Sequence, residues 1–434
     1  MVPNPTIMNA VEKLGYRVTV GDVATQAGLE INQAQQGLLT LASQAQGHLQ
    51  VAESGDIAYE FPRNFRTVLR NKYRQLRWQE TWQKIWRILF YLIRISFGIV
   101  LILSLVLMLL AVAIMIITIQ SSSDSDSDSG GNRGGGGFFF PRFWFTPDIF
   151  WLFDPSYDYR RSRTKDESKE GKMNFLESVF SFLFGDGDPN KDLEQKSWQQ
   201  IGTIINNNQG AVVAEQIAPH VDEIAAGELE SEDFMIPVLA RFNGYPEVSP
   251  QGEIIYYFPE LQVTATQQNL PGKSIPAYLQ EKIEQFSQAS GGQLVLATCL
   301  GGANFVLAVV LGSMLQDYQV SGGLVALVDS IYWFLFAYGT AFLAIPLVRY
   351  FWLKVKNSAI KNRNHQRNKL ASTLEQGDAN LRDKVAYARQ FASQKVIDEG
   401  DLAYTTQTDL IEQNISNSEK IDAEWQRRLD SGQS

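Results

Sequence analysis

The sequence predicts an α+β membrane protein with two winged-helix domains, about three transmembrane helices and an aromatic segment that is interfacial or re-entrant. Two observations lead to this fold class. Three long apolar segments interrupt a chain of 434 residues in which 20% of the residues are charged. In addition, the block GHLQVAESGDIAYEFP at 47–62 returns at 244–259 as GYPEVSPQGEIIYYFP, with seven identical positions and no gap.

The order of these features along the chain gives the expected domain organisation. We expect a first winged-helix domain (1–71), a basic interfacial helix (72–94), a first transmembrane helix (95–119), a Ser/Asp/Gly linker (120–137), an aromatic interfacial or re-entrant segment (138–153), a connecting segment (154–192), a second winged-helix domain (193–265), transmembrane helices at 293–315 and 322–348, and a basic, mostly helical C-terminal tail (349–434).

The first winged-helix domain is predicted from the order of its elements. Apolar residues have helical spacing in 6–16, and 17–44 has the pattern of a helix, a turn and a second helix. Two alternating segments in 48–61 then form a β-hairpin, in which Gly55 supplies the positive φ of the turn. The buried stripe of the second helix is predicted to consist of Leu38, Leu39 and Leu41.

The second domain repeats this order. Helices are predicted at 197–208, 211–221 and 231–243, and strands at 245–248 and 254–258. Chance similarity of two hairpins is the alternative explanation. The equal length of the two blocks and the matching elements upstream favour a duplicated winged helix.

The charges argue against nucleic-acid binding by these domains. A protein that binds duplex DNA needs Lys and Arg for the phosphates and side chains that reach base edges. No Lys or Arg occurs between Val18 and Phe61, the predicted recognition helix of the second domain has only Arg241, and the whole chain has a net charge of −9. Asn and Gln can read adenine, so a membrane-tethered transcription regulator stays as an alternative to protein–protein contacts.

Three segments are long and apolar enough to cross a bilayer. Residues 95–119 and 293–315 contain no charge, and 322–348 contain one charged residue, Asp329. We interpret Asp329 as an intramembrane polar residue that makes a helix–helix hydrogen bond. A transporter subunit, which would need such residues along a pathway, is a further alternative.

A basic segment precedes the first span. Residues 63–94 contain nine Lys or Arg and one acid, with Trp78, Trp82 and Trp86 four residues apart on one helical face. This composition predicts an interfacial helix that binds lipid headgroups, and it favours a cytoplasmic N-terminal domain. The N-terminus lacks the pattern of a cleavable signal peptide.

The segment after the linker is unusually aromatic. Nine of the sixteen residues in 138–153 are aromatic, and two prolines and two charges argue against an ordinary spanning helix there. Residues 349–369 hold seven Lys or Arg and no acid, which favours a cytoplasmic tail although three spans would place it outside. Either 138–153 supplies a fourth crossing, or the loop is long enough to escape the charge rule. The interaction candidates in this segment are Phe138, Phe139, Phe140, Trp144 and Trp151.

We find no catalytic, cofactor-binding or metal-binding constellation in the sequence. The single cysteine, Cys299, lies in a predicted span, and the three histidines have no ligand spacing. The segment 186–192 begins like a calcium loop but has Lys191 where Gly is needed and Ser197 where Glu is needed. The protein is therefore expected not to be an enzyme.

Several segments carry a resemblance to a known family: LGYRVTVGDVATQAGL, SGDIAYEFPRNFR, GGGGFFFPRFWFTPDIFWLFDP, FLESVFSFLFGDGDPN and DLAYTT, between Leu14 and Thr406. With these residues the chain resembles an uncharacterised family of cyanobacterial membrane proteins that has relatives in the chloroplast envelope of plants. The plant relatives carry an iron–sulfur cluster biosynthesis description, but one cysteine in a predicted span cannot build a cluster scaffold. The resemblance implies a photosynthetic host and a chloroplast-like membrane rather than an activity.

These expectations together favour a non-enzymatic, membrane-anchored adaptor or assembly factor. Its expected partners are a protein complex in or on the membrane and lipid headgroups, without nucleic acid, and a homo-oligomer is left open. The expected location is the thylakoid or plasma membrane of a cyanobacterium. Two domains on one chain would bind a partner bivalently and raise its apparent affinity.

Overall fold

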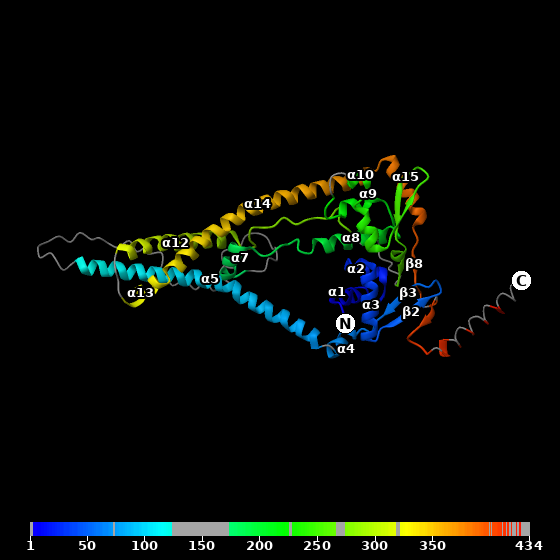
Figure 1. The fold of residues 1–434 in the computed structure, drawn as a ribbon, viewed down its shortest axis with the longest axis horizontal. Coiled ribbons are helices and arrows are strands. Elements are labelled where there is room, and N and C mark those ends of the chain that lie inside the picture. Colours follow the sequence, from blue (N-terminus) through cyan, green and yellow to red (C-terminus); the bar gives the residue numbers. More distant parts are fainter. Residues whose placement is uncertain are drawn as a thin grey trace, which may run out of the picture. The chain divides into compact units, whose positions relative to one another are not determined.

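The computed structural model describes residues 3–72, 74–123, 173–224, 228–265, 274–317, 322–398 and much of 400–426 (Figure 1). The chain forms two compact units. Unit 1 comprises Met1–Thr81, Asn190–Lys282 and Ile360–Ser434, and unit 2 comprises Trp82–Pro189 and Ile283–Ala359. Across these described residues the fold is mixed α+β with a large excess of helix and three long apolar helices, which confirms the coarse fold class.

The first segment of unit 1 contains helices and a small antiparallel sheet. Thr19 and Asp22 form a capping box at the start of α2, and Gly28 ends that helix in the left-handed conformation. Leu39 of α3, which the sequence places in the buried stripe, is 44% exposed. The elements are α1 (Pro5–Lys13), β1 (Arg17–Thr19), α2 (Val20–Ala27), α3 (Ile31–Ala45), β2 (His48–Ala52), β3 (Ile57–Glu60) and α4 (Phe65–Lys72).

The second segment of unit 1 contains a comparable sheet. Its strand order is β4-β6-β5, and the corresponding strands of the first sheet have the order β1-β3-β2. The elements are α8 (Leu193–Asn207), β4 (Ala211–Val212), α9 (Ala214–Ile217), η2 (Ala218–His220), α10 (Glu228–Ser231), α11 (Met235–Phe242), β5 (Tyr245–Val248), β6 (Ile254–Tyr257), η3 (Pro259–Leu261) and β7 (Val263–Thr264).

Glycine and phenylalanine positions shared by the two sequence blocks have the same packing role. A Cβ atom at Gly47 would lie 2.8 Å from the Phe61 ring, and a Cβ atom at Gly244 would lie 2.3 Å from the Phe258 ring. Both phenylalanines are buried. Each glycine therefore lets a buried aromatic ring lie directly against the backbone that enters the hairpin.

The two segments share one hydrophobic core. Buried side chains of α1–α4 and of α8–η3 belong to the same cluster, and α2 packs against α8. A Cβ atom at Gly28 would lie 3.0 Å from the Gln195 carbonyl oxygen and 3.2 Å from Trp198. The Arg241 guanidinium lies 4.0 Å from the Trp198 ring centre and donates to the Gly28 carbonyl at 2.9 Å. The two parts are thus one packed body.

The C-terminal segment of unit 1 packs on both sheets. Helix α15 covers the outer face of the second sheet, where Ala388 joins a buried cluster with Val213 and Ile255. Strand β8 pairs in parallel with β7, and β9 pairs antiparallel with β2. The sequence predicts a mostly helical tail, and the structure shows two strands there that the sequence did not predict. The elements are α15 (Ala379–Ala388), η4 (Arg389–Phe391), β8 (Lys395–Val396) and β9 (Leu402–Thr405).

Unit 2 is a helical assembly with two apolar clusters. The helices long and apolar enough to cross a membrane are Lys84–Gln120, Gly291–Asp317 and Tyr332–Gln376. The predicted span 322–348 is divided at Ile331, and the basic segment after it continues the same helix. The elements are α5 (Arg74–Ser123, which begins in unit 1), α7 (Phe175–Phe184), α12 (Gly291–Asp317), α13 (Gly323–Ser330) and α14 (Tyr332–Gln376, which ends in unit 1).

Candidate functional site

The three tryptophans singled out by the sequence lie on α5. Trp78, Trp82 and Trp86 are 67%, 55% and 54% exposed, respectively. Their spacing of four residues keeps them on one side of the helix. Phe138, Phe139, Phe140, Trp144 and Trp151 lie outside the described residues.

Asp329 lies on α13 and is exposed. Other residues make a buried polar contact between two apolar helices: the Asn304 amide of α12 donates to the Ser104 hydroxyl of α5 at 2.5 Å. Both side chains are buried. The sequence pattern missed this pair because single Ser and Asn residues in apolar helices are common and carry no charge.

A lysine holds α15 on the second sheet. The Lys384 side chain is 3% exposed, and its Nζ lies 3.0 Å from Glu215 and 2.7 Å from Glu232. Tyr256 donates to Glu232 at 2.6 Å. Burial would lower the pKa of Lys384, but its hydrogen bonds to Glu232 and Glu215 raise the pKa above the ordinary value. Lys384 therefore stays charged and fixes α15 in place.

A second ion-pair network holds the end of α14. The Glu281 carboxylate accepts from Arg363 Nε at 2.7 Å and from Arg367 Nη1 at 2.7 Å. Arg367 also pairs with Asp222 at 3.2 Å. Burial would raise the pKa of Glu281, but the hydrogen bonds and charges of the two arginines lower it below the ordinary value. These contacts fix the helix that leads into α15 against the second segment of unit 1.

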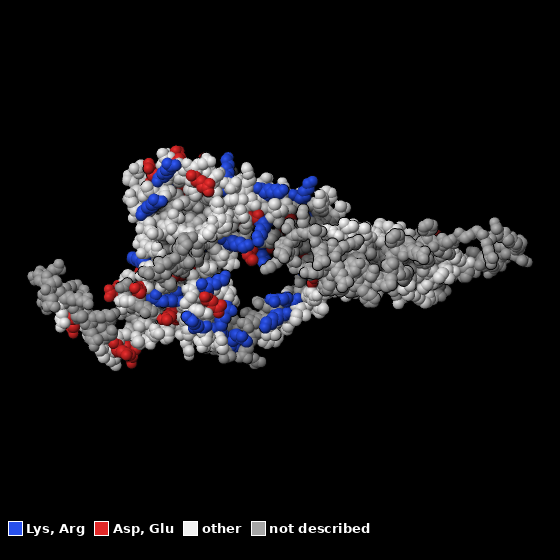
Figure 2. Space-filling model, turned by 180° about the vertical axis from the view of Figure 1, so that it is seen from behind, with Lys and Arg blue, Asp and Glu red and all other residues white. Residues whose placement is uncertain are grey.

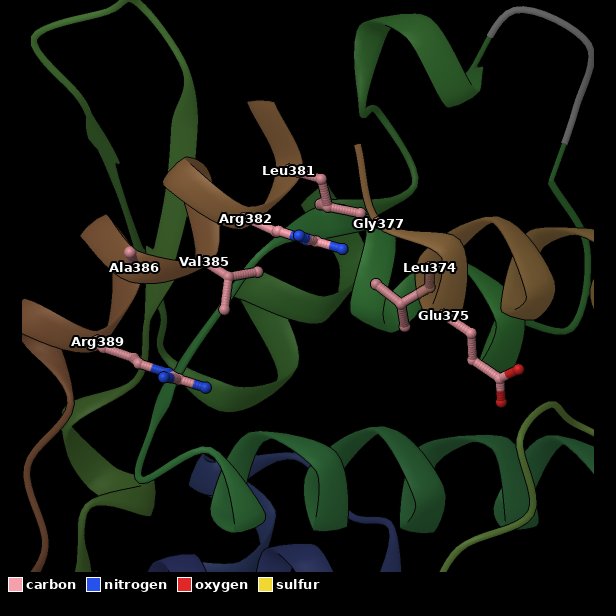
Figure 3. Close-up of a pocket in the computed structure, with 8 residues that line it drawn as sticks. All are labelled: Leu374, Glu375, Gly377, Leu381, Arg382, Val385, Ala386 and Arg389. Carbon is pink, nitrogen blue, oxygen red and sulfur yellow. The ribbon is translucent and has the colours of Figure 1, made fainter. Parts of the chain in front are cut away.

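A groove lies where α14 ends and α15 begins (Figure 3). Gly377, with a φ of 39°, lies between the two helices. The groove has a volume of about 280 Å³. In Figure 3 the side chains of Arg382 on α15 and of Arg389, which follows the last residue of α15, extend to the same side, with Val385 between them. Its lining residues are Leu374, Glu375, Gly377, Leu381, Arg382, Val385, Ala386 and Arg389.

A second cavity of about 300 Å³ shares Val385 and Arg389 with this groove. Its other walls are mostly amide side chains from the end of α8 and from α9: Asn207, Asn208, Gln209 and Gln216 line it together with Ala211, Ala388 and Ala392. The two cavities adjoin each other at these two residues, and together we call them the α15 groove. Sequence reasoning missed it because the amide walls come from residues far from α15 in the chain.

The exposed face of α3 is uncharged. It consists of Asn32, Gln33, Gln35, Gln36, Leu39 and Ser43. On α11, Ile236 is 62% exposed, and the nearby Arg241 is already engaged with Trp198 and Gly28. Figure 2 shows Lys and Arg interspersed with Asp and Glu on the face of unit 1 that it presents. These helix faces cannot neutralise a row of phosphates.

Within the described ranges, no group of three or more His, Cys, Asp or Glu is placed to hold a metal ion. What the structure defines is a class: a mixed α+β protein with three helices apolar enough to cross a membrane and a separately packed unit with uncharged helix faces and an arginine-lined groove.

The chain is similar over most of its length to a plant protein. It is 38% identical over 435 aligned residues to an Arabidopsis thaliana protein described as "Uncharacterized protein At5g03900, chloroplastic", with 97% of this chain and 81% of the plant protein covered. The chain belongs to the family of this chloroplastic protein. Comparison with protein-family models gave no match, and no solved structure matches the chain.

Proposed function

We propose that this protein is a non-enzymatic adaptor or assembly factor that is anchored in a photosynthetic membrane and binds a protein complex there. The observation that carries the proposal is the exposed face of α3, which bears amides, a leucine and a serine but no Lys or Arg. Such a face suits contacts with another protein and disfavours contacts with a phosphate backbone. The chloroplastic relative supports a photosynthetic membrane.

A winged-helix assignment of both parts of unit 1 belongs to this proposal. Each part has a helix, a short strand, further helices and a hairpin in that order, and the first strand pairs with the last strand of the hairpin in both. The helix before the hairpin, α3 or α11, would be the recognition helix in such a domain. In this protein we assign both helices to partner binding.

Because the two parts share a core, they would act as one rigid surface rather than as two tethered modules. A rigid pair of sites loses less conformational freedom on binding than a flexible pair does. The partner would therefore contact α3 and α11 in a fixed spacing.

The proposed membrane anchor consists of α5, α12 and α14. Residues 1–81, 190–282 and 360–434 belong to one unit, so in a membrane they would lie on one side. The basic residues of 63–94 and 349–369 favour the cytoplasmic side or its plastid equivalent. Exposed tryptophans on α5 support contact with the headgroup region.

The test is affinity purification of the intact protein from gently solubilised native membranes. It is compared with a double variant, Gln36→Glu and Leu39→Glu, which charges the exposed face of α3 without touching its buried side. Partner proteins that copurify with the wild type and decrease at least about fivefold with the variant would support the proposal.

A control variant adds the same kind of charge on a different helix of the same unit. Asn9 is exposed on α1, and a glutamate there keeps an oxygen acceptor for Arg66. Asn9→Glu should retain the partners. Copurification of specific DNA, with unchanged protein content in all variants, would instead favour a transcription regulator.

A further inference from the structure

We infer that the α15 groove binds an acidic segment of a partner protein that carries apolar side chains between its carboxylates. This inference deepens the proposed adaptor function and rests on it. Nothing in the relative's description assigns such a site. Three features of the groove carry the inference: its unpaired cations, its apolar strip and its rigid support.

The cations of the groove are available. In the described part of the chain, Arg382 and Arg389 make no side-chain hydrogen bond or ion pair, and both are exposed. The cations that hold the fold together, Arg363, Arg367 and Lys384, each pair with a carboxylate. Two arginines without an ion pair that line one groove favour an anionic ligand, because a guanidinium binds a carboxylate in a bidentate arrangement.

The spacing of the arginines favours an elongated ligand. Residues seven apart return to nearly the same face of an α-helix and lie roughly 10 Å apart along its axis. Val385 lies between Arg382 and Arg389 on that face (Figure 3). A single small anion would satisfy one guanidinium, whereas a peptide with two carboxylates at this separation would satisfy both.

The walls of the groove suit a peptide. Leu374, Leu381 and Val385 supply an apolar strip, and Asn208 and Gln216 supply amides that can bond a peptide backbone. Volumes of about 280 Å³ and 300 Å³ are at the lower end of the range for small-molecule sites. Glu375 also lines the groove, and its negative charge would repel ligand carboxylates from the end of α14.

The support of the groove is rigid. Lys384 and Ala388 face the second sheet, one in an ion pair and the other in a buried cluster. Val385 also packs against this cluster, and the exposed Arg382 and Arg389 lie beside it, so the packing of α15 positions all three. A site held this way loses little side-chain and backbone freedom when a ligand binds.

The experiment uses the full-length protein in lipid nanodiscs and a fluorescent peptide that alternates glutamate with leucine. Fluorescence anisotropy gives the dissociation constant. We expect Arg382→Gln and Arg389→Gln each to weaken binding about 2- to 5-fold, and the double variant about 10-fold or more. A peptide that alternates glutamate with serine should bind more weakly to the wild type, because it lacks the apolar contacts.

Lys369→Gln is the matched control, since Lys369 is an exposed cation of unit 1 that lines neither cavity. Its affinity for the peptide should equal that of the wild type. Equal losses in all three variants, or no peptide binding, would overturn the inference, as would binding of inorganic phosphate alone with the same arginine dependence. If the variant with Gln36→Glu and Leu39→Glu loses its partner proteins but the groove does not bind the peptide, the adaptor proposal holds and only the inference about the groove fails.

Discussion

His220 is a buried histidine whose surroundings keep it neutral. It bonds through Nδ1 with the Gln200 amide oxygen at 2.9 Å, and its own carbonyl accepts from the Ser197 hydroxyl at 2.7 Å. Burial lowers the pKa of His220 to about 4. An imidazole in this position serves the local packing at the end of η2 and does not titrate near neutral pH.

This pKa predicts an acid-sensitive step in stability. The unfolded chain takes up a proton near pH 6.5, whereas the folded chain does so only near pH 4. The contribution of neutral His220 is therefore present above pH 6.5 and is lost as the pH falls to 4, by up to about 3 kcal/mol. Thermal unfolding at several pH values should show this decline, and stability should depend less steeply on pH in the His220→Asn variant. An equally steep dependence in that variant would mean that other groups cause the decline.

Lys384 is predicted to hold α15 by charge. Lys384→Met would leave Glu215 and Glu232 without their cation next to Tyr256, and we expect a loss of about 1–3 kcal/mol in the free energy of unfolding. Hydrogen exchange should accelerate specifically in Ala379–Ala388. Lys369→Met, at an exposed position, should leave that exchange unchanged. Equal protection of α15 in both variants would mean that the apolar cluster alone holds the helix.

At the scale of elements, the two hairpins protect their edge strands differently. The edge of β2 is covered by β9, and the Leu49 amide donates to Thr406 Oγ1 at 2.9 Å while the Leu49 carbonyl accepts from the Thr406 amide at 3.0 Å. The equivalent residue of β5 is Pro246, which has no amide hydrogen to offer a further strand. One edge is paired and the other is chemically blocked, which are two known ways to prevent edge-to-edge association.

This difference predicts the effect of removing β9. A chain that ends after Asp398 would expose the β2 edge, and we expect concentration-dependent self-association in detergent, measured by light scattering. Leu49→Pro in the shortened chain should suppress it, because that substitution copies the protection of β5. Val51→Pro, two residues further along the same strand, is the control. It shows whether suppression could result simply from disruption of the hairpin by a proline. Association that is unaffected by Leu49→Pro would place the contact elsewhere.

The elements that the sequence predicts well are those whose signal is local. The apolar helices follow from uncharged runs, and the hairpins follow from Gly55 and its counterpart Gly252, both of which have positive φ. Strands β8 and β9 are short and exist because β7 and β2 lie beside them, so no local pattern identifies them. The same holds for the α15 groove, whose walls come from α8, α9 and the end of α14.

At the scale of the whole molecule, unit 1 is built from three separate segments of the chain, and this restricts how the chain can cross a membrane. Residues 1–81 and 190–282 share one core, so the chain between them must cross an even number of times. In the proposed membrane anchor, helix α5 would supply one crossing, whereas α7, with ten residues, spans only about 15 Å and is too short for another. Helices α12 and α14 would supply the two crossings between 282 and 360.

A return crossing is therefore predicted between Gln120 and Asn190. The aromatic segment 138–153, which the sequence offers as a fourth crossing, falls in this stretch and lies outside the described residues. Single cysteines introduced into a Cys299→Ser background test this with a membrane-impermeant maleimide applied to sealed vesicles. Ser54→Cys, Gln251→Cys and Gln407→Cys report the three segments of unit 1, and all should react from the same side. Asp317→Cys, at the end of α12, should react only from the opposite side. Reaction of Gln251→Cys together with Asp317→Cys would mean that the chain does not return, and the shared core of unit 1 could not form in a membrane.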